Sequence, residues 1–383
     1  MTCDLDRISA LDRRIIADAQ SLLLAHSAAD ILVLNDPTGA LTDWATRATA
    51  GRVFVREVSY AAARTLRIKH PHIFISGLTV NGAADYSTMA LDDFLRAHGF
   101  TGSLALGRLP KTHSALAELA REFSEYQTDR GSQAELLLGG NTKHMVKTFN
   151  DTIAKSFAQV RGLRGKGKHR CVLASDPRAA SDSTRSASYH SNDAVNAGTF
   201  EGADTNQLAA FGGVFSGGKP DQGGALLAAA AVNWLEKHAA KQQTVLDLGC
   251  GNGSVSVEIM GRVSDLVRKL TATDIDMDAV RSTRVNLASV GNAEVLWDDA
   301  ASGLPANSVD LLLLNPPFHS GHEIDMTLVK PLLHAAKRVL KPGGTMLLVH
   351  NSHARYRKQV AALFSGVMQL QRNRTYTLLQ ADP

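Results

Sequence analysis

Short apolar runs alternate with stretches of helical periodicity along the first 175 residues of the chain. The runs have the length of buried strands, and the stretches between them repeat their apolar positions at helical spacing. The runs predict strands at Ile31–Leu34, Val53–Val55, His72–Ser76, Ser103–Leu106, Glu135–Leu138 and Arg170–Ala174. The periodic stretches predict helices that include Leu91–Ala97, Ser114–Phe123 and Met145–Val160. This alternation is typical of an α/β fold built on a parallel sheet.

The second half of the chain repeats the alternation, with clearer turns between its elements. Its predicted strands are Thr244–Leu248, Thr271–Thr273, Ala293–Trp297, Val309–Leu314, Thr345–Val349 and Arg374–Gln380. Its predicted helices are Ala225–Ala240, Val255–Leu270, Asp278–Val290 and Met326–Leu340. We expect the last helix to stop at Lys341–Gly344, where a proline and two glycines follow. Val309–Leu314 is expected as a central strand, buried on both faces of a sheet of about seven strands.

A segment without periodicity separates the two halves. Residues 176–202 are rich in Ser, Ala and Asn and show neither strand nor helix spacing. We interpret them as a linker between a first domain at residues 1–175 and a second domain at residues 203–383. The chain is therefore expected to form two α/β domains in tandem.

Composition narrows the class of protein. The chain has 383 residues, of which 44% are hydrophobic and 20% charged, as in ordinary globular proteins and unlike collagens, acidic disordered proteins or disulfide scaffolds. Cys3, Cys171 and Cys250 are isolated, so neither a zinc site nor a disulfide framework is expected. No further ligands follow His319, His322 and Glu323 at metal spacing, so no metal is expected. The first residues contain no signal-peptide core, and the longest apolar run, Ala225–Val232, is too short to span a bilayer. We therefore expect a cytoplasmic protein with no membrane partner.

Charge is distributed unevenly along the chain. The total of 41 basic and 37 acidic residues gives a net charge of only +4. Residues 201–310 carry 8 basic and 14 acidic residues, whereas residues 311–383 carry 9 and 3. The acidic segment suits a cationic ligand, and the basic segment suits a nucleic-acid backbone.

A glycine-rich turn lies between a predicted strand and a predicted helix, in Val245–Gly253. Gly249, Gly251 and Gly253 allow the backbone to turn sharply and to approach a ligand closely, because no Cβ intervenes. The spacing is GxGxG, whereas a dinucleotide site requires GxGxxG. Asp247, two residues before the first glycine, would repel phosphates but can bind an ammonium group directly or through water.

Two further acids follow the next two predicted strands. Asp274 is placed to bind both hydroxyls of a ribose, and Asp299 can accept from the amino group of an adenine. A nucleoside that carries an amino acid and a sulfonium fits this set of acids. The motif therefore predicts an S-adenosylmethionine site; the alternative is a glycine turn with incidental acids.

The sequence Asn315-Pro316-Pro317-Phe318 comes directly after the predicted central strand. The side-chain oxygen of Asn315 and the carbonyl of Pro316 can each accept one hydrogen of an exocyclic amine, which directs the nitrogen toward a methyl donor. Pro317 stiffens the turn, and Phe318 offers a face on which a base can stack. The alternative is a turn that only terminates the strand.

These motifs resemble those of the class I S-adenosylmethionine-dependent methyltransferases that act on planar amines. His319 after Phe318 narrows the resemblance to the ribosomal RNA guanine methyltransferases that modify the 2-amino group, which are methyltransferase C for small-subunit RNA and methyltransferase G for large-subunit RNA. The resemblance extends over nearly the whole chain. Segments that match the large-subunit type are Ile31–Leu41, Leu109–Thr112 and Leu138–Lys143, and Val214–Ser216 with Asp221–Gly224 resembles the segment over the cofactor pocket.

The first domain has the same strand, turn and helix order but a different turn, Asn35–Gly39. One glycine replaces three, and Pro37 occupies the loop. We infer two tandem Rossmann-like class I methyltransferase domains, of which the N-terminal one is degenerate and serves RNA recognition or folding. The alternative is a purely structural partner.

The resemblance implies a monomeric enzyme that methylates the 2-amino group of a guanine in large-subunit ribosomal RNA, as free RNA or in a pre-ribosomal subunit. The small-subunit RNA, adenine or a protein glutamine remain alternative substrates. A scaffold that binds RNA during ribosome assembly, without catalysis, is the alternative outside enzymes. Arg161–Arg170, with five basic residues in ten positions, is a candidate phosphate contact or a solvated loop.

Overall fold

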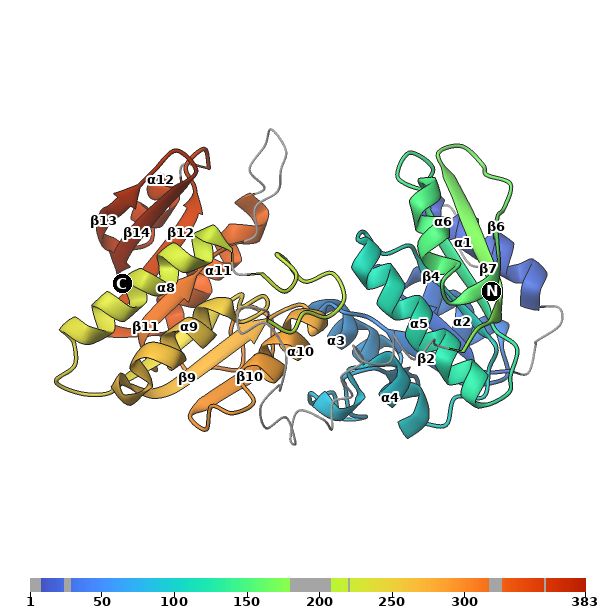
Figure 1. Ribbon diagram of the computed structural model, residues 1–383, viewed down its shortest axis with the longest axis horizontal. Coiled ribbons are helices and arrows are strands. Elements are labelled where there is room, and N and C mark those ends of the chain that lie inside the picture. The colour runs from blue at the N-terminus through green and yellow to red at the C-terminus, as the bar shows by residue number, and fades with distance from the viewer. Residues whose placement is uncertain (1–7, 24–28, 180–207, 220, 317–325, 355) are drawn as a thin grey trace. The chain divides into compact units, whose positions relative to one another are not determined.

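The computed structural model describes the chain except residues 1–7, 24–28, 180–207, 220, 317–325 and 355. The chain divides into two compact units (Figure 1). The first comprises Met1–Ala194 and Phe211–Gly213, and the second comprises Val195–Ala210 and Val214–Pro383. Each unit contains one seven-stranded sheet with helices packed against it, so the predicted α/β fold class is confirmed.

The sheet of the first unit has the order β3-β2-β1-β4-β5-β7-β6. Its strands are β1 (Ile31–Leu34), β2 (Val53–Arg56), β3 (Phe74–Ile75), β4 (Leu104–Arg108), β5 (Glu135–Asn141), β6 (Phe157–Gly162) and β7 (His169–Pro177). Its helices are α1 (Ala10–Leu23), α2 (Ala40–Ala48), α3 (Tyr60–Lys69), α4 (Leu91–Ala97), α5 (His113–Asp129) and α6 (Lys147–Ile153), with the 3-10 turn η2 (Tyr86–Thr88). Strands β1 to β5 pair in parallel, and β7 and β6 extend the sheet in antiparallel pairing.

The sheet of the second unit has the order β10-β9-β8-β11-β12-β14-β13. Its strands are β8 (Gln243–Leu248), β9 (Val267–Asp274), β10 (Ala293–Trp297), β11 (Val309–Leu314), β12 (Leu340–Asn351), β13 (Ser365–Arg372) and β14 (Tyr376–Asp382). Its helices are α8 (Gln222–Lys237), α9 (Ser254–Val263), α10 (Met277–Asn286), α11 (Met326–Val339) and α12 (Arg357–Ala361), with the 3-10 turn η4 (Ser264–Leu266). Strands β8 to β12 pair in parallel, and β14 and β13 are antiparallel.

The two sheets are copies of one topology. Each strand of the first sheet has its counterpart seven strands later in the chain, with the same neighbours and the same parallel or antiparallel pairing. The registers also agree. The last residue of β1 pairs with β2 and β4, and the last residue of β8 pairs with the equivalent strands β9 and β11. The equivalent positions are Leu34, Arg56 and Gly107 in the first sheet and Leu248, Thr273 and Leu314 in the second. Residues that follow these strands can therefore be compared one by one.

The central strand of the second unit is buried over its whole length, as predicted. All six residues of β11 are buried, including Asp310. Alternate residues of β8, β11 and β12 face α11 and form one core cluster with its residues Val329, Leu333 and Ala336. Burying each leucine of this cluster stabilises the unit by about 2 kcal/mol. The sheet is thereby a rigid base for the loops at its carboxyl edge.

Two predicted helices are wrong in part, because their predicted ranges extend over residues that form strands. The predicted helix Met145–Val160 is the short helix α6 followed by β6. Phe149, Ile153 and Phe157 are four residues apart and mimic a helical face, but Phe157 is buried in the core of the first unit at the start of a strand paired with β7. The predicted helix Val255–Leu270 likewise ends at Val263, after which η4 leads into β9.

Two features near the end of the chain also differ from expectation. The helix α11 ends at Val339, close to the predicted end, but β12 follows at once from Leu340, so Lys341–Gly344 lie in a strand with an irregular register against β11. The strand β13 is not predicted, because seven of its eight residues are exposed and show no apolar alternation. Pairing with β14 makes it an edge strand.

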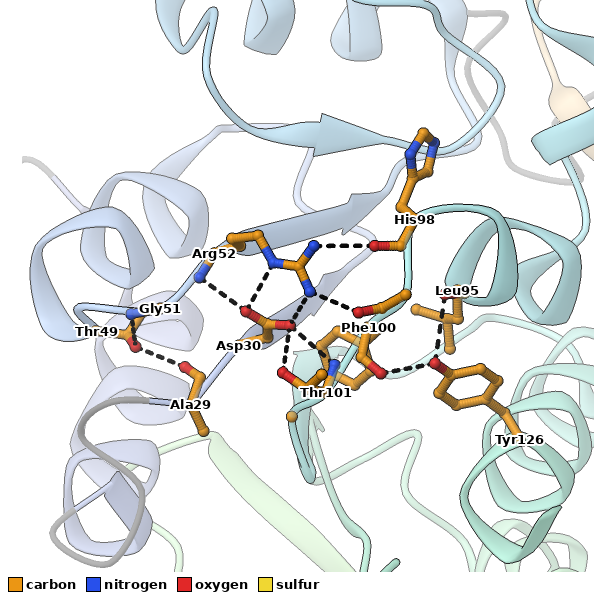
Figure 2. A network of polar contacts seen from close by, with 12 residues as sticks. Ala29, Asp30, Thr49, Gly51, Arg52, Leu95, His98, Phe100, Thr101 and Tyr126 are labelled. Carbon is orange, nitrogen blue, oxygen red and sulfur yellow. Dashed lines mark hydrogen bonds and ion pairs between the residues drawn. The ribbon is translucent and has the colours of Figure 1, made fainter. Parts of the chain in front are cut away.

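A polar network joins the amino-terminal ends of β1, β2 and β4 in the first unit (Figure 2). The buried carboxylate of Asp30 accepts hydrogen bonds from the backbone N–H of Arg52 at 2.9 Å and from its Nη2 at 2.7 Å. The same carboxylate accepts from the backbone N–H and the hydroxyl of Thr101, both at 2.8 Å. Beside it, the hydroxyl of Tyr126 donates to the carbonyl of Phe100 at 2.6 Å. The network lies at the opposite edge from the loops described below, so we assign it to stability.

We expect this network to make the first unit sensitive to acid. Burial raises the pKa of Asp30, but hydrogen bonds from Arg52 and Thr101 outweigh it and lower the pKa to about 2. A depressed pKa in the folded state contributes stability above the ordinary value of 3.8, and that stability is lost as the pH falls toward 2. The contribution is about 2 kcal/mol. Urea unfolding of the full chain between pH 5 and pH 2.5 measures it.

Asp30→Asn should remove this part of the pH dependence. Asp151→Asn, at an exposed acid of the same unit, should keep it. The same pH profile for Asp30→Asn and the wild type would contradict the assignment.

Candidate active site

The loop from β8 to α9 is built on glycines with left-handed backbone. Gly249, Gly251 and Gly253 have φ of 80°, 57° and 80°. A Cβ on Gly253 would lie 2.9 Å from the side chain of Thr283, so glycine is required there. A Cβ on Gly249 or Gly251 would meet no atom within 4 Å among the described residues. The loop backbone therefore borders open space, into which a ligand can reach.

Hydrogen bonds fix the shape of this loop. The carbonyl of Thr273 at the end of β9 accepts from the N–H groups of Gly249 and Cys250, at 2.8 Å and 3.0 Å. The hydroxyl of Thr283 donates to the carbonyl of Gly251 at 2.9 Å. The loop is thus held from β9 and from α10 before any ligand binds.

Asp274 lies directly beside the glycine loop, as predicted for a residue of the same site. One carboxylate oxygen accepts from the N–H of Gly251 and the other from the N–H of Asp276, each at 2.9 Å. Burial raises the pKa of Asp274. Asp276 begins α10 as its N-cap, and burial with the charges of Asp278 and Asp274 raises its pKa to about 7. Each oxygen of Asp274 keeps a lone pair for a hydroxyl donor.

Asp247 and Asp299 differ in accessibility. Asp247 is 2% exposed and accepts from the hydroxyl of Ser256 at 2.6 Å. Burial, and then the charge of Asp274, raises the pKa of Asp247 to about 6. Asp299 is exposed after β10, and burial together with the neighbouring Asp298 raises its pKa. The carboxylate of Asp298 already accepts a hydrogen bond from the N–H of Gly303 at 2.9 Å. Asp299 is therefore the acid of this pair that is open to a ligand.

Asn315 follows β11 at the same edge of the sheet as the glycine loop, because Leu314 pairs with Leu248. Its Nδ2 donates to a carboxylate oxygen of Asp221 at 2.8 Å. Its Oδ1 is buried and has no hydrogen-bond partner among the described residues. A buried acceptor without a partner is costly unless a ligand supplies the donor. Pro316 is buried beside it.

Two predicted site residues, Pro317 and Phe318, lie outside the described residues. The others lie in three places at one edge of the sheet. Asp247, Asp274 and the three glycines surround the loop after β8, and Asn315 with Pro316 follows the adjacent strand. Asp299 follows β10, and the Asp298 N–H beside it donates to the carbonyl of Asp274 at 3.0 Å.

Asp221 belongs to the segment Asp221–Gly224, which resembles the segment over the cofactor pocket, but the sequence gives it no role in the site. It is the N-cap of α8 and accepts from the N–H groups of Gly223 and Gly224. An Asp before two glycines at the start of an apolar helix does indicate an N-cap. No local signal indicates its hydrogen bond to Asn315, which is 94 residues away in the sequence.

Basic residues also gather at this edge. Arg372 ends β13 and Arg374 lies in the turn between β13 and β14, and both are exposed. Pairing of Asn351 with Tyr376 places this turn where β12 ends, at the edge that carries Asn315. The acids near the glycine loop and these two arginines therefore lie at the same edge of the sheet, and they belong to the acidic and the basic segment of the sequence.

The equivalent loop of the first unit lacks these features. Asn35, with φ of 51°, replaces Gly249, and Gly39 retains the role of Gly253 at the start of a helix. Pro37 replaces Gly251 and has no N–H to donate. Glu57 stands where Asp274 stands, but its Oε2 is buried without a partner in the described part of the chain.

Arg108 takes the place of Asn315 in the first unit. Its guanidinium binds the fully buried Asp12 through Nε at 2.8 Å and Nη2 at 2.7 Å. An arginine offers only donors, so this unit presents no acceptor at that position. The structure thus supports a degenerate first unit.

In the part of the chain that the structure describes, no helix is long and apolar enough to cross a membrane. Among the same residues, no group of three His, Cys, Asp or Glu side chains is arranged to hold a metal ion.

Residues 205–380 match the family model described as Methyltransferase small domain. Ribosomal RNA large subunit methyltransferase G of Shewanella amazonensis is 30% identical over 364 residues, which cover 92% of this chain and 86% of the relative. Ribosomal RNA small subunit methyltransferase C of Pseudomonas aeruginosa is 36% identical over 151 residues, which cover 39% of this chain and 43% of the relative.

The fold is similar to that of the 16S rRNA N2 G1207 methyltransferase of T. thermophilus, solved in complex with AdoMet and guanosine. The TM-score is 0.69 with 19% sequence identity, and the match covers 98% of this chain and 92% of the other. At this identity the likeness shows a common fold over both units.

Proposed function

Because the chain belongs to the family of ribosomal RNA large subunit methyltransferase G, we propose that it transfers a methyl group from S-adenosylmethionine to the exocyclic 2-amino group of a guanine in large-subunit ribosomal RNA. The observation that carries this proposal is the buried Oδ1 of Asn315 beside the glycine loop, which has no hydrogen-bond partner in the described part of the chain. In this proposal it would accept one hydrogen of the amine.

The residues around the glycine loop fit the cofactor. The open space beside Gly249 and Gly251 lets a ligand lie against the loop backbone. Asp274, whose oxygens are fixed by two N–H donors, would bind the ribose hydroxyls. Asp299 would accept from the adenine amino group, and Asp247 would attract the ammonium group directly or through water. S-adenosylmethionine, when bound, supplies an electrophilic methyl group on a sulfonium.

The residues after β11 would orient the amine. A guanine 2-amino nitrogen is a weak nucleophile, because its lone pair is delocalised into the ring. Acceptance of its two hydrogens by Oδ1 of Asn315 and the carbonyl of Pro316 would point the nitrogen lone pair toward the methyl group. We propose that Pro317 stiffens this turn and that Phe318 stacks on the base. A guanine in a helix must first be flipped out, at a cost of a few kcal/mol.

The test compares ribosomal RNA from cells with and without the gene. Mass spectrometry should show one 2-methylguanine missing from large-subunit RNA in the deletion strain. Transfer in vitro to naked RNA and to assembled subunits then identifies the substrate. Loss from small-subunit RNA would favour the alternative ribosomal substrate, and unchanged 2-methylguanine would contradict the proposal.

Binding of S-adenosylmethionine should tighten as the pH rises from 5 to 7.5. The pKa of Asp247 is raised by burial to about 6, so its carboxyl is mostly protonated at the lower pH and ionised at the higher. A cationic ligand prefers the ionised form, and each unit by which it lowers the pKa corresponds to about tenfold in affinity. Isothermal titration calorimetry across this range measures the effect.

Asp247→Asn should lose the part of this pH dependence that Asp247 contributes, because the amide does not ionise; Asp276, whose pKa is raised to about 7, still titrates in this range. S-adenosylhomocysteine keeps the ammonium group and lacks the sulfonium charge. The same dependence with this ligand assigns the effect to the ammonium group. A variant that retained the wild-type pH profile would contradict the role of Asp247.

We further propose that the protein acts as a monomer in the cytoplasm, where ribosomal RNA is modified, with the RNA or a pre-ribosomal subunit as its partner. Amine methylation by a sulfonium needs no Lewis acid, so no metal is included in the proposal. Sedimentation equilibrium of the full chain at micromolar concentration tests the assembly state.

A further inference from the structure

One carboxylate connects the start of α8 with the residue after β11. Asp221 caps α8 by accepting the N–H of Gly223 at 3.2 Å on Oδ1 and the N–H of Gly224 at 2.9 Å on Oδ2. The same Oδ2 accepts from Nδ2 of Asn315 at 2.8 Å. The carboxylate therefore binds both a helix terminus and the side-chain amide of the candidate catalytic residue.

This contact selects one orientation of the amide. A carboxylate can only accept hydrogen bonds, so only the NH2 end of the Asn315 amide can face Asp221. The opposite rotamer would set the amide oxygen against a carboxylate oxygen. Oδ1 is thereby kept on the far side of the amide, where it is buried without a partner among the described residues.

We infer that Asp221 is a positioning residue for methyl transfer, which holds Asn315 with its acceptor oxygen available to the incoming amine. The inference rests on the proposed function and assigns a role to a residue that acts through Asn315. A hydrogen bond to a charged acceptor is stronger than one between neutral groups. Without it, the amide can turn by 180° and offer a donor to the amine.

The surroundings of Asp221 fit this role. A Cβ on Gly223 would lie 3.0 Å from a ring carbon of Tyr376 and 3.2 Å from Oδ2 of Asp221. The close approach of the helix start to β14 thus depends on glycine at this position. The hydroxyl of Tyr376 donates to Oδ1 of Asp221 at 3.4 Å. The carboxylate is held by two helix N–H groups and by the first residue of β14.

The first unit shows the same pairing without the acceptor. Asp12, in the first turn of α1, binds Arg108, which occupies the position of Asn315. Both units therefore join an acid at the start of the helix before the sheet to a residue at the carboxyl end of the fourth strand of that unit. In the second unit the residue bound by the acid is Asn315, which keeps Oδ1 as an acceptor, whereas Arg108 in the first unit has no acceptor. This difference agrees with methyl transfer at the second unit alone.

The test separates the helix cap from the positioning role. Serine is also a strong N-cap, but it lacks the carboxylate that binds Asn315. We expect Asp221→Ser to lower kcat by about 10- to 100-fold, the value of a hydrogen bond to a charged group. The Kd for S-adenosylmethionine and the KM for RNA should change by less than about threefold, because the variant keeps the contacts that bind both substrates before the reaction. Asp85→Ser makes the same change at the N-cap of η2 and should keep wild-type turnover.

A double variant tests the coupling. If Asp221 acts through Asn315, Asp221→Ser should cost almost nothing more in a chain that already carries Asn315→Ala. Losses that multiply, or wild-type kcat in Asp221→Ser, would overturn the inference. Asp221→Asn keeps the size of the side chain and is the replacement variant if Asp221→Ser does not fold. The NH2 group of the new amide can donate to Oδ1 of Asn315, so this variant should also have a lower kcat than the wild type.

Nuclear magnetic resonance gives a readout apart from turnover. In the full chain with 15N-labelled asparagine, the side-chain NH2 signal of Asn315 is assigned by its absence in Asn315→Ala. It should shift in Asp221→Ser and stay in place in Asp85→Ser. An unmoved signal in Asp221→Ser would overturn the inference even if turnover fell. An inactive wild type with a shifted signal would contradict the proposed function and leave the pairing supported.

Discussion

Asn315→Ala should reduce turnover by about 10²–10³-fold, the usual cost of removing one preorganised polar group from an active site. The variant removes the acceptor that is buried beside the glycine loop without a partner in the described chain. It leaves Gly251, Asp274 and their hydrogen bonds intact, so the affinity for S-adenosylmethionine should change little. Single-turnover transfer of a labelled methyl group to RNA, together with calorimetry of cofactor binding, measures both quantities.

The control is Asn233→Ala, at an exposed asparagine of α8 in the same unit. It makes the same truncation away from the sheet edge and should keep wild-type turnover. If Asn315→Ala also turned over at the wild-type rate, Asn315 would not orient the amine.

Asp274→Asn should weaken S-adenosylmethionine binding by about 10²–10³-fold. Both oxygens of Asp274 accept from backbone N–H groups, those of Gly251 and Asp276. An asparagine has one oxygen, so its NH2 end must face one of these donors. The variant therefore loses a loop contact and also the second acceptor for the ribose, each a charge-assisted bond of about 1.5–3 kcal/mol. Calorimetry at pH 7.5 measures the Kd.

The duplicated fold supplies the matched control. Glu57 occupies the position of Asp274 in the first unit, and burial, with a smaller effect from Asp36, raises its pKa to about 7. Glu57→Gln changes a carboxylate to an amide at the equivalent place and should leave cofactor affinity unchanged. Equal weakening in both variants would show that the effect is general destabilisation rather than loss of a binding group.

The sequence predicts the fold well where local pattern and tertiary role agree. The strand β11 is recognisable because burial on both faces requires a run of apolar residues. The glycine loop is recognisable because left-handed backbone favours glycine at Gly249, Gly251 and Gly253. Asp274 follows from its place at the end of the next strand. These signals lie within a few residues of the features that they indicate.

The features missed from the sequence depend on contacts between distant segments. The spacing of Phe149, Ile153 and Phe157 suits a helix, and only pairing with β7 makes β6 a strand. The exposed strand β13 carries no apolar pattern and is defined by its hydrogen bonds to β14. The contact between Asp221 and Asn315 joins residues 94 positions apart. Spacing in one sequence contains no information about such pairs.

The ion pair between Arg108 and Asp12 has a consequence for the evolution of the first unit. Arg108→Asn alone would leave the charge of Asp12 buried without its bidentate partner, at a cost of about 3–5 kcal/mol. Pro37→Gly alone would restore a loop N–H while Arg108 still occupied the position that corresponds to Asn315. Each single step toward a second active site is therefore neutral or harmful, and only several together could be favoured. With the arginine and the proline both in place, no single substitution gives this half of the chain the loop donor and the amide acceptor together.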